Sequence, residues 1–395
     1  MRLIEILLVL SSFILFFNIV FIKRLNRRIV ITTSLIGAVI LTMQLLLEGY
    51  RWQLFILYLL SFLFILKLLF YPKVQIKVWK PIVYLFRTTI LFVMIASACL
   101  TVYMPVNPLP KPEGKYTTGT QTFHLIDKMR DESFTKENQD VRQFMMQIWY
   151  PAQNTNKGEA AFLFSQDKRT FQQYKEAYAN AIGIPSFLFD YLKYIQTHSY
   201  EDAPIASSKE SFPVVLLSHG LGTSRHLHVS QAEHLASNGY IVVAIDHTYI
   251  AAGSAFPDGT FAPFQAIDFE KRFFEMDNTY GDTLVKDLNS AINYLQQLHT
   301  GKISSSFQGK IDLKNIGVMG HSFGGAAAFH ATQENSNIKA GINMDGSLYP
   351  INQMNDKLKP FLFIEDETFF SVRKNSNKEY FQIAVFLKNS YNNSK

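Results

Sequence analysis

The sequence is poor in cysteine and in charged residues. Cys99 is the one cysteine among 395 residues, so an intrachain disulfide is impossible and cysteine usage does not indicate a redox compartment. Charged residues make up 18% and hydrophobic residues 48%, which is an apolar balance for a soluble protein of this length. The length suits one large domain, or a domain with an appendage.

Acidic residues are nearly absent from the first 104 positions. Eleven Lys and Arg stand there against only Glu5 and Glu48, a net charge of +9, which leaves −3 for the rest of a chain whose total is +6. The larger part of the chain is therefore mildly acidic and implies no basic face. This balance argues against nucleic acid as a main partner.

Four long apolar runs fill the same stretch: Leu3–Ile22, Ile29–Leu47, Trp52–Tyr71 and Ile82–Met104. Each is close to the roughly 20 residues that a helix needs to cross about 30 Å of hydrocarbon. Four runs in series without a small-residue cleavage site do not suit a signal peptide, and a buried soluble bundle is the remaining alternative. We expect residues 1–104 to form four transmembrane helices.

Positive charge in the connecting loops predicts the orientation of these helices. The first loop (KRLNRR, 23–28) has four positive charges, the third (72–81) has three lysines, and the second (EGYR, 48–51) has no net charge. The positive-inside rule then places the first and third loops in the cytoplasm. The N-terminus and everything after Met104 would lie outside the cytoplasm, with the helices in the plasma membrane.

A proline-rich segment, residues 105–115, follows the last apolar run. Its prolines resist helix and sheet and favour an extended, stiff linker. We therefore expect one large domain over residues 116–395, held off the bilayer by this linker.

The large domain alternates between two hydrophobic periods. Asp282–Leu298 has apolar residues at helical spacing, whereas short β-branched runs are typical of buried parallel strands. This alternation predicts a doubly wound, mostly parallel α/β domain with its site at the carboxyl ends of the strands. The expected strands are Val141–Pro151, Pro213–Gly220, Tyr240–His247, Asn315–Ser322, Ile338–Asp345 and Pro360–Asp366.

The pentapeptide GHSFG at 320–324 fits G-x-S-x-G, with an apolar strand before it and a small-residue helix after it. Ser322 is the candidate nucleophile, and the N–H of Phe323 at the helix start would face a developing oxyanion. Leu221 N–H, in the loop SHGLGTSRHLH (218–228), is the candidate second donor. The alternative for GHSFG is a glycine-rich packing turn, and the alternative for the loop 218–228 is an ordinary strand-to-helix turn.

A carboxylate should follow the serine, because the chain order in this fold is Ser, then Asp or Glu, then His. Asp345 ends a predicted strand and enters a glycine turn, which suits this role. Glu365 and Asp366, at the end of the next run, are its competitors.

Together these motifs resemble the platelet-activating-factor acetylhydrolase family, its bacterial members more than the plasma enzyme. The matching segments, in family order, are TGTQTFHLIDKMRDESF, FMMQIWYPA, SHGLGTSRHLH, IDHTYIAAGSAFPDG, GHSFGGAAA and NMDGSLYP, within about residues 116–364. The resemblance implies an α/β-hydrolase that removes short or oxidised acyl chains from phospholipids or similar esters, with no metal or other cofactor.

The resemblance also implies roles for individual residues. Ser322 matches the nucleophile, Asp345 the triad acid 23 positions later, and Leu221 and Phe323 the oxyanion donors. The segment 183–198 (GIPSFLFDYLKYIQTH) resembles an apolar helical insertion near the mouth of the site, which suits a lid or an acyl-chain wall. A plain core helix is the alternative for this segment.

The catalytic histidine stays unassigned, because no histidine follows Asp345, whereas family members have their base after one further strand. We expect the C-terminal strand and helix of the fold to be missing. His321 is adjacent to Ser322 along a strand, so its side chain should point to the opposite face and pack beneath the sheet.

Four other histidines lie near the expected site. We expect His219 to brace the oxyanion loop and His247 to brace the turn after its strand, while His226 and His228 lie further along the first loop. Any base among them would have to replace the family's own.

Three functions follow from these residues. The first is a membrane-anchored serine esterase acting on a lipid or other ester beside the bilayer. The second is a truncated, catalytically impaired remnant or a binding protein on the same scaffold, with a marginal large domain because a sheet edge is exposed. The third is acyl transfer to an acceptor other than water. The sequence defines neither the exact ester nor the oligomeric state.

Overall fold

The computed structural model describes residues 1–21, 26–70, 79–135, 140–153, 159–207, 211–265, 280–346 and 358–367. The chain forms two compact units. The first comprises Met1–Pro108 and Phe187–Ile195, and the second comprises Leu109–Ser186 and Gln196–Lys395. The short segment 187–195 thus belongs to the first unit, although the chain on either side of it belongs to the second.

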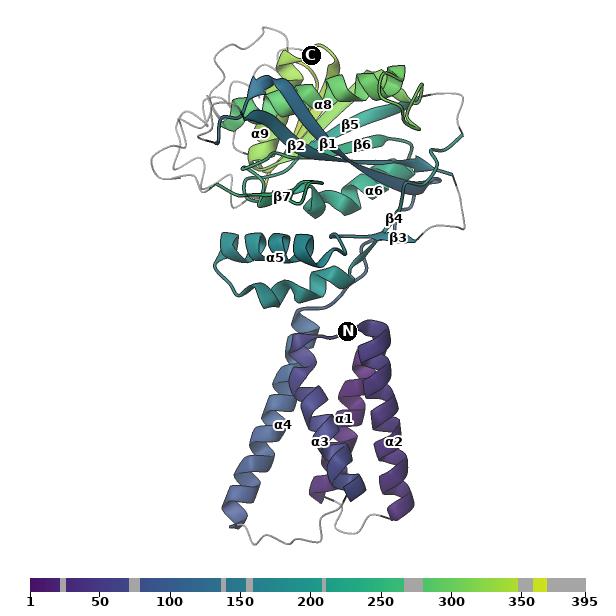
Figure 1. Cartoon of the computed structure of the whole chain (residues 1–395), viewed down its shortest axis with the longest axis vertical. Helices are drawn as coiled ribbons and strands as arrows, with labels where there is room; N and C mark the ends of the chain where they lie inside the picture. Colours follow the sequence, from purple (N-terminus) through teal and green to yellow (C-terminus); the bar gives the residue numbers. More distant parts are fainter. Residues whose placement is uncertain are drawn as a thin grey trace. The chain divides into compact units, whose positions relative to one another are not determined.

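The first unit is a set of apolar helices (Figure 1). Its elements are α1 (Leu3–Phe21), α2 (Arg27–Met43), the π-helical turn η1 (Gln44–Glu48), the 3₁₀ turn η2 (Trp52–Leu54), α3 (Phe55–Phe70) and α4 (Lys80–Tyr103). Large apolar side chains such as Leu46 and Phe92 are 78% and 72% exposed, a surface that suits contact with lipid.

Helices form in all four predicted apolar runs. Among the described residues, three helices are long and apolar enough to cross a membrane: Leu3–Phe21, Arg28–Glu48 and Lys80–Tyr103. The apolar helix at Trp52–Lys67 is shorter. Four crossings, and the bilayer itself, stay a prediction.

Buried charges join the ends of these helices. Arg51 and Glu5 are fully buried, and Arg51 Nη1 lies 2.9 Å from Glu5 Oε1. Arg51 also donates to the Met104 carbonyl, while Glu48 accepts from the backbone N–H groups of Ile4 and Glu5 at 3.0 Å. Both acidic residues of the first 104 positions therefore serve one cluster, in which each buried charge has an opposite partner.

The segment 187–195 packs within this helical unit. The Phe187 ring meets Trp52 edge-on, with ring centroids 5.0 Å apart. The Tyr194 hydroxyl donates to the Tyr50 carbonyl at 2.8 Å, and the Arg2 guanidinium lies 5.2 Å from the Tyr194 ring centroid. These contacts assign residues 187–195 to the helical unit, while a role as a lid or an acyl-chain wall stays a prediction.

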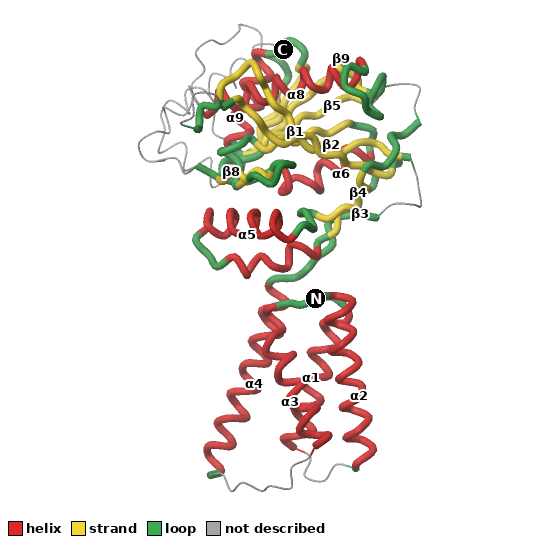
Figure 2. The backbone as a smooth tube through the Cα atoms, viewed as in Figure 1, coloured by secondary structure: helices red, strands yellow, loops and turns green. Residues whose placement is uncertain are grey.

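The second unit is a sheet covered by helices, with a small hairpin beside it (Figure 2). Within the described residues, the sheet has nine strands in the order β11-β10-β9-β5-β6-β2-β1-β4-β3. Its strands are β1 (Thr117–Asp131), β2 (Val141–Ala152), β3 (Ala160–Phe162), β4 (Gln196–Glu201), β5 (Phe212–Ser218), β6 (Ile241–Asp246), β9 (Ile311–His321), β10 (Ile338–Met344) and β11 (Phe361–Ile364). The hairpin pairs β7 (Gly253–Ala255) with β8 (Phe261–Pro263).

The sheet is mixed and mostly parallel. Strands β11, β10, β9, β5 and β6 run parallel to one another, and β1 runs parallel to β4. Strand β2 is antiparallel to both β6 and β1, and β3 is antiparallel to β4. All six strands expected from the sequence are present. The helices of the second unit are α5 (Lys168–Ile182), η4 (Arg225–His228), α6 (Val229–Ser237), α8 (Asp282–Thr300) and α9 (Phe323–Glu334). The 3₁₀ helix η3 (Ser186–Tyr194) covers most of the segment 187–195, which belongs to the first unit.

The two faces of the sheet have separate cores. Leu216 packs with residues of α8 and α9, whereas its neighbour Leu217 packs with residues of α6 on the other face. Adjacent residues alternate in this way because successive strand side chains point to opposite faces. Both faces are covered, which explains why β5 and β6 read as continuous apolar runs.

The predicted linker has neither helix nor strand over residues 105–113, all of which are described. Its later part packs on the second unit: the Leu109 carbonyl accepts from His198 Nε2 at 2.8 Å, and Gly114 N–H donates to Ser237 Oγ at 3.1 Å. The expected loss of a C-terminal strand and helix concerns positions after 367, which lie outside the described residues.

We expect Arg51→Met to destabilise the helical unit by about 3–5 kcal/mol, because it leaves the Glu5 carboxylate buried with one cation fewer. Thermal unfolding of the full chain in detergent measures this change. Arg87→Met is the control, because Arg87 lies on α4 and has no ion pair among the described residues. Equal unfolding temperatures for the two variants would contradict the role of Arg51.

Candidate active site

Ser322 lies at a sharp turn between strand β9 and helix α9. Its backbone has φ 50° and ψ −122°, a conformation that a non-glycine residue rarely adopts. The strain is held by neighbouring hydrogen bonds, including one from Ser322 N–H to the Met344 carbonyl at 2.9 Å. This is the geometry that a nucleophile elbow requires.

The glycines of the pentapeptide are required by close backbone contacts. A Cβ atom on Gly320 would lie 2.1 Å from the Gly324 carbonyl oxygen, and one on Gly324 would lie 2.4 Å from the Ser218 carbonyl oxygen. Both distances are far below contact distance, so any side chain would push α9 away from β5 and β9. The G-x-S-x-G spacing thus follows from the packing of the elbow.

Asp345 directly follows β10, the strand parallel to β9. In that pairing Met344 is opposite His321, so Asp345 and Ser322 leave neighbouring strands at the same level. Asp345 has φ 56°, and its N–H donates to the Ile364 carbonyl at 2.7 Å. A Cβ atom on Gly346 would lie 2.2 Å from the Ser322 carbonyl oxygen, which shows how closely the two turns approach.

The competing carboxylates lie one strand further from the elbow. Glu365 and Asp366 follow β11, which pairs with β10 and not with β9. The backbone N–H of Asp366 donates to Asp345 Oδ1 at 3.1 Å. The chain after β11 thus helps to orient the Asp345 carboxylate.

The loop after β5 passes beside the elbow. A Cβ atom on Gly220 would lie 3.2 Å from Ser322 Cβ and 3.0 Å from His321 Nδ1. Glycine therefore allows the Gly220–Leu221 peptide to approach the serine. No hydrogen bond within the described chain uses the N–H of Leu221. Phe323 is the first residue of helix α9, so its N–H lies in the first turn of that helix, next to Ser322.

His219 and His247 are both fully buried and have both ring nitrogens in hydrogen bonds. His219 Nδ1 lies 2.7 Å from the Gly220 carbonyl oxygen, and its Nε2 accepts from His247 N–H at 3.0 Å. His247 Nδ1 lies 3.0 Å from Asp287 Oδ2, and its Nε2 lies 2.9 Å from Ser218 Oγ. Neither ring can take the Ser322 proton in this arrangement.

The remaining nearby histidines differ in their surroundings. His226 bonds to Ser224 Oγ through Nδ1 at 3.0 Å and stacks on Phe164, with ring centroids 4.6 Å apart. His228 is buried, and burial together with the nearby His321 lowers its pKa to about 4. Its Nδ1 has no hydrogen-bond partner among the described residues.

His321 does not pack beneath the sheet as expected. It is exposed, and its ring centroid lies 6.0 Å from that of His228. The expectation failed because β9 ends at His321, so the strand no longer has a covered face there.

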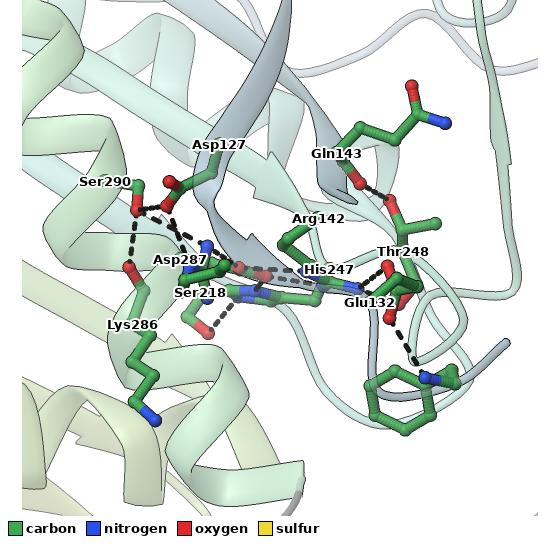
Figure 3. Close-up of polar contacts among 12 residues, drawn as sticks. Asp127, Glu132, Arg142, Gln143, Ser218, His247, Thr248, Lys286, Asp287 and Ser290 are labelled. Carbon is green, nitrogen blue, oxygen red and sulfur yellow. Dashed lines mark hydrogen bonds and ion pairs between the residues drawn. The ribbon is translucent and has the colours of Figure 1, made fainter. Parts of the chain in front are cut away.

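A buried ionic network that sequence patterns did not reveal reaches Ser218, at the end of β5, through His247 (Figure 3). Asp287 of α8 accepts from Arg142 Nη2 at 2.6 Å and from Arg130 Nη2 at 2.7 Å, and Arg142 Nη1 lies 3.0 Å from Glu132. Although burial would raise the pKa of Asp287, the charge of Arg142 and the hydrogen bond from His247 hold it well below its usual range. The carboxylate is therefore ionised at neutral pH.

One signal in the sequence could have revealed this network. Asp287 lies three residues after Leu284 and four before Ala291, both fully buried on the core face of α8. A carboxylate at a core position needs a buried cation, which is Arg142. Burial lowers the pKa of His247 despite the opposing effect of Asp287, so the neutral ring donates from Nδ1 and accepts the Ser218 hydroxyl at Nε2.

The fold is shared with ester hydrolases of the α/β type. Ferulic acid esterase from Streptomyces cinnamoneus superimposes with a TM-score of 0.53 and 26% sequence identity, over 70% of this chain and 72% of the esterase chain. A strand-to-helix turn with a strained serine is the site that such a fold presents. The chain belongs to the platelet-activating factor acetylhydrolase, isoform II family, whose model matches residues 103–385, and so to the carboxylic ester hydrolases.

Curated relatives agree with this assignment. Platelet-activating factor acetylhydrolase of Cavia porcellus is 23% identical over 76% of this chain and 70% of its own, and that of Canis lupus familiaris is 24% identical over 66% and 60%. A probable 1-alkyl-2-acetylglycerophosphocholine esterase of Arthroderma benhamiae is 29% identical over 40% of this chain and 36% of its own. The matches span less than two thirds of the dog and fungal proteins. The resemblance stated from the sequence motifs is confirmed.

We expect Asp287→Asn to destabilise the protein by about 3–5 kcal/mol at pH 7, because it leaves Arg142 buried without its main counter-charge. The pKa of Asp287 is depressed in the folded state, so its contribution is full above the unfolded pKa of about 4 and declines as the pH falls further. Unfolding in urea from pH 7 to pH 3 measures both effects.

Asp282→Asn serves as the control for this experiment. Asp282 lies on the same helix and pairs with Lys286 at 2.6 Å, but both side chains are about half exposed. Such pairs contribute less than about 1 kcal/mol. A stability difference between Asp287→Asn and the wild type that stays constant down to pH 3 would contradict the ionised network.

Proposed function

We propose that this chain is a membrane-anchored serine esterase that cleaves short or oxidised acyl esters of phospholipids or related lipids. The observation that carries the proposal is the strained Ser322 at the end of β9, beside the Gly220–Leu221 peptide. Family membership and the activities named for its relatives support an ester substrate of the lipid class.

The reaction would proceed through an acyl-enzyme on Ser322. The Ser322 oxygen attacks the ester carbonyl, while the N–H groups of Leu221 and Phe323 stabilise the oxyanion that forms. The C–O bond to the alcohol then breaks, the alcohol leaves with a proton, and water releases the acid in a second step. Asp345 would orient the base that accepts the Ser322 proton. No metal or other cofactor takes part in this proposal.

The proposed location is the outer face of a plasma membrane. Apolar helices of spanning length support the anchor, and the lysines and arginines of the first and third loops support a hydrolase unit outside the cytoplasm.

A second candidate function is binding of an ester or lipid without turnover. The observation that favours it is the commitment of both ring nitrogens of His219 and His247 to buried partners, which leaves neither ring available to Ser322. Without a base, a serine hydrolase retains only about 10³–10⁴-fold rate enhancement over water. Acyl transfer to another acceptor would use the same residues as hydrolysis.

We expect Ser322→Ala to lower the hydrolysis of p-nitrophenyl acetate by at least about 10³-fold, because the acyl-enzyme cannot form. Steady-state rates of the full chain in detergent measure this loss, and labelling by a fluorophosphonate should disappear with it. Ser336→Ala, an exposed serine after α9, is the control. Equal rates for wild type and Ser322→Ala would exclude the esterase and leave the binding function.

We expect Asp345→Asn to lower kcat by about 10³–10⁴-fold, the loss typical of a triad acid that orients a base. Asp366→Asn should lower it far less, because its carboxylate lies one strand further from the elbow. Both variants would be compared on the same ester. A larger loss for Asp366→Asn would assign the acid to β11 instead of β10.

A further inference from the structure

The carbonyl oxygen of Gly220 accepts three hydrogen bonds. His219 Nδ1 donates to it at 2.7 Å, Thr223 Oγ1 at 2.7 Å and the Thr223 backbone N–H at 3.1 Å. A carbonyl oxygen has two lone pairs, so this acceptor is saturated. Rotating the Gly220–Leu221 peptide plane would weaken all three bonds together.

The other end of the same peptide unit is the N–H of Leu221. The Gly220–Leu221 bond is trans, so the N–H points opposite to the saturated carbonyl. No hydrogen bond within the described residues takes up this N–H. The peptide is thus fixed at its carbonyl and open at its amide, on the loop that approaches Ser322 Cβ.

The donor on His219 depends on its tautomer. His219 Nε2 accepts from the backbone N–H of His247, so the ring proton must lie on Nδ1, which faces Gly220. Burial, and then the neighbouring His247, lower the pKa of His219 well below its usual value, so the ring is neutral. A neutral ring with this tautomer donates to the Gly220 carbonyl and needs no counter-ion.

His247 is fixed in turn by the ionic network of Asp287. Its ring is held between Ser218 Oγ and Asp287 Oδ2, and Asp287 accepts hydrogen bonds from Arg142 (Figure 3). Arg130 also donates to Asp287. A continuous series of hydrogen bonds therefore runs from α8, through His247 and His219, to the peptide beside Ser322.

We propose that His219 and Thr223 are positioning residues that hold the Gly220–Leu221 peptide with its N–H toward the oxyanion formed at Ser322. The assignment of that oxyanion rests on the proposed function. The fixed peptide orientation does not, because it is set by contacts made without substrate. The Asp287–His247 pair acts indirectly: Asp287 holds the His247 ring, and the His247 backbone N–H donates to His219 Nε2.

Thr223→Val tests this role with little change of shape, because it removes the hydroxyl donor and keeps the backbone N–H. We expect kcat for p-nitrophenyl acetate to fall by at least about 10-fold with KM within about 2-fold, because a misdirected donor weakens binding of the transition state only. Thr223→Ser restores the hydroxyl and should recover most of kcat. A merely structural role would not separate kcat from KM and would not respond to serine in this way.

Hydrogen exchange gives a readout that does not need turnover. In Thr223→Val the N–H of residue 223 should exchange at least about 10-fold faster than in the wild type, because the peptide that accepts it is less firmly held. Thr300→Val is the control, since its hydroxyl also bonds a backbone carbonyl but lies on α8, where it is exposed. The full chain in detergent is used throughout.

The outcomes separate the positioning role from the esterase. Faster exchange and a lower kcat in Thr223→Val, in a protein whose turnover requires Ser322, support both the positioning role and the esterase. Faster exchange in a protein without Ser322-dependent turnover supports the fixed peptide and rejects the esterase. Unchanged exchange, or a loss that appears only in KM, overturns the positioning role even if the wild type hydrolyses the ester.

Discussion

The ion pair between Asp287 and Arg142 joins helix α8 to strand β2 near the carboxyl ends of β5 and β6. Both side chains are almost completely buried, so each charge is tolerable only because the other is present. The carboxylate also receives His247, which fixes the end of β6, and through His219 it reaches the loop after β5. The position of the loop beside Ser322 thus depends on a charge that has no contact with solvent.

Local patterns were sufficient to predict six of the nine described strands of the sheet, the turn at Ser322 and the family. The strands are short apolar runs, and the glycines of GHSFG are fixed by backbone contacts that any protein with this turn must make. The ionic network could not be predicted in the same way, because Arg142 and Asp287 are 145 positions apart and meet only in the folded chain. The expectation for His321 was wrong because side chains alternate between the two faces of a sheet only while the strand continues, and β9 ends at His321.

Buried charges are paired with opposite charges in both the helical unit and the hydrolase unit. In the first, Glu5 and Arg51 pair where helix ends meet, and in the second, Asp287 pairs with two arginines at a strand edge. Each cluster lies where several elements end and backbone groups would otherwise lack partners. Charges are few in the helical unit, yet its two acidic residues are both placed at this junction.

The segment 187–195 changes how the two units are connected. The chain passes between them after residue 108, again after 186 and a third time after 195. A single proteolytic cut in the proline-rich spacer would therefore break one connection of three. The chain on either side of residues 187–195 would still connect the hydrolase unit to the helical unit, within which Phe187 contacts Trp52 and Tyr194 bonds to Tyr50. Cleavage of the spacer alone would therefore leave the two units covalently joined, unlike a domain that is connected by a single stalk.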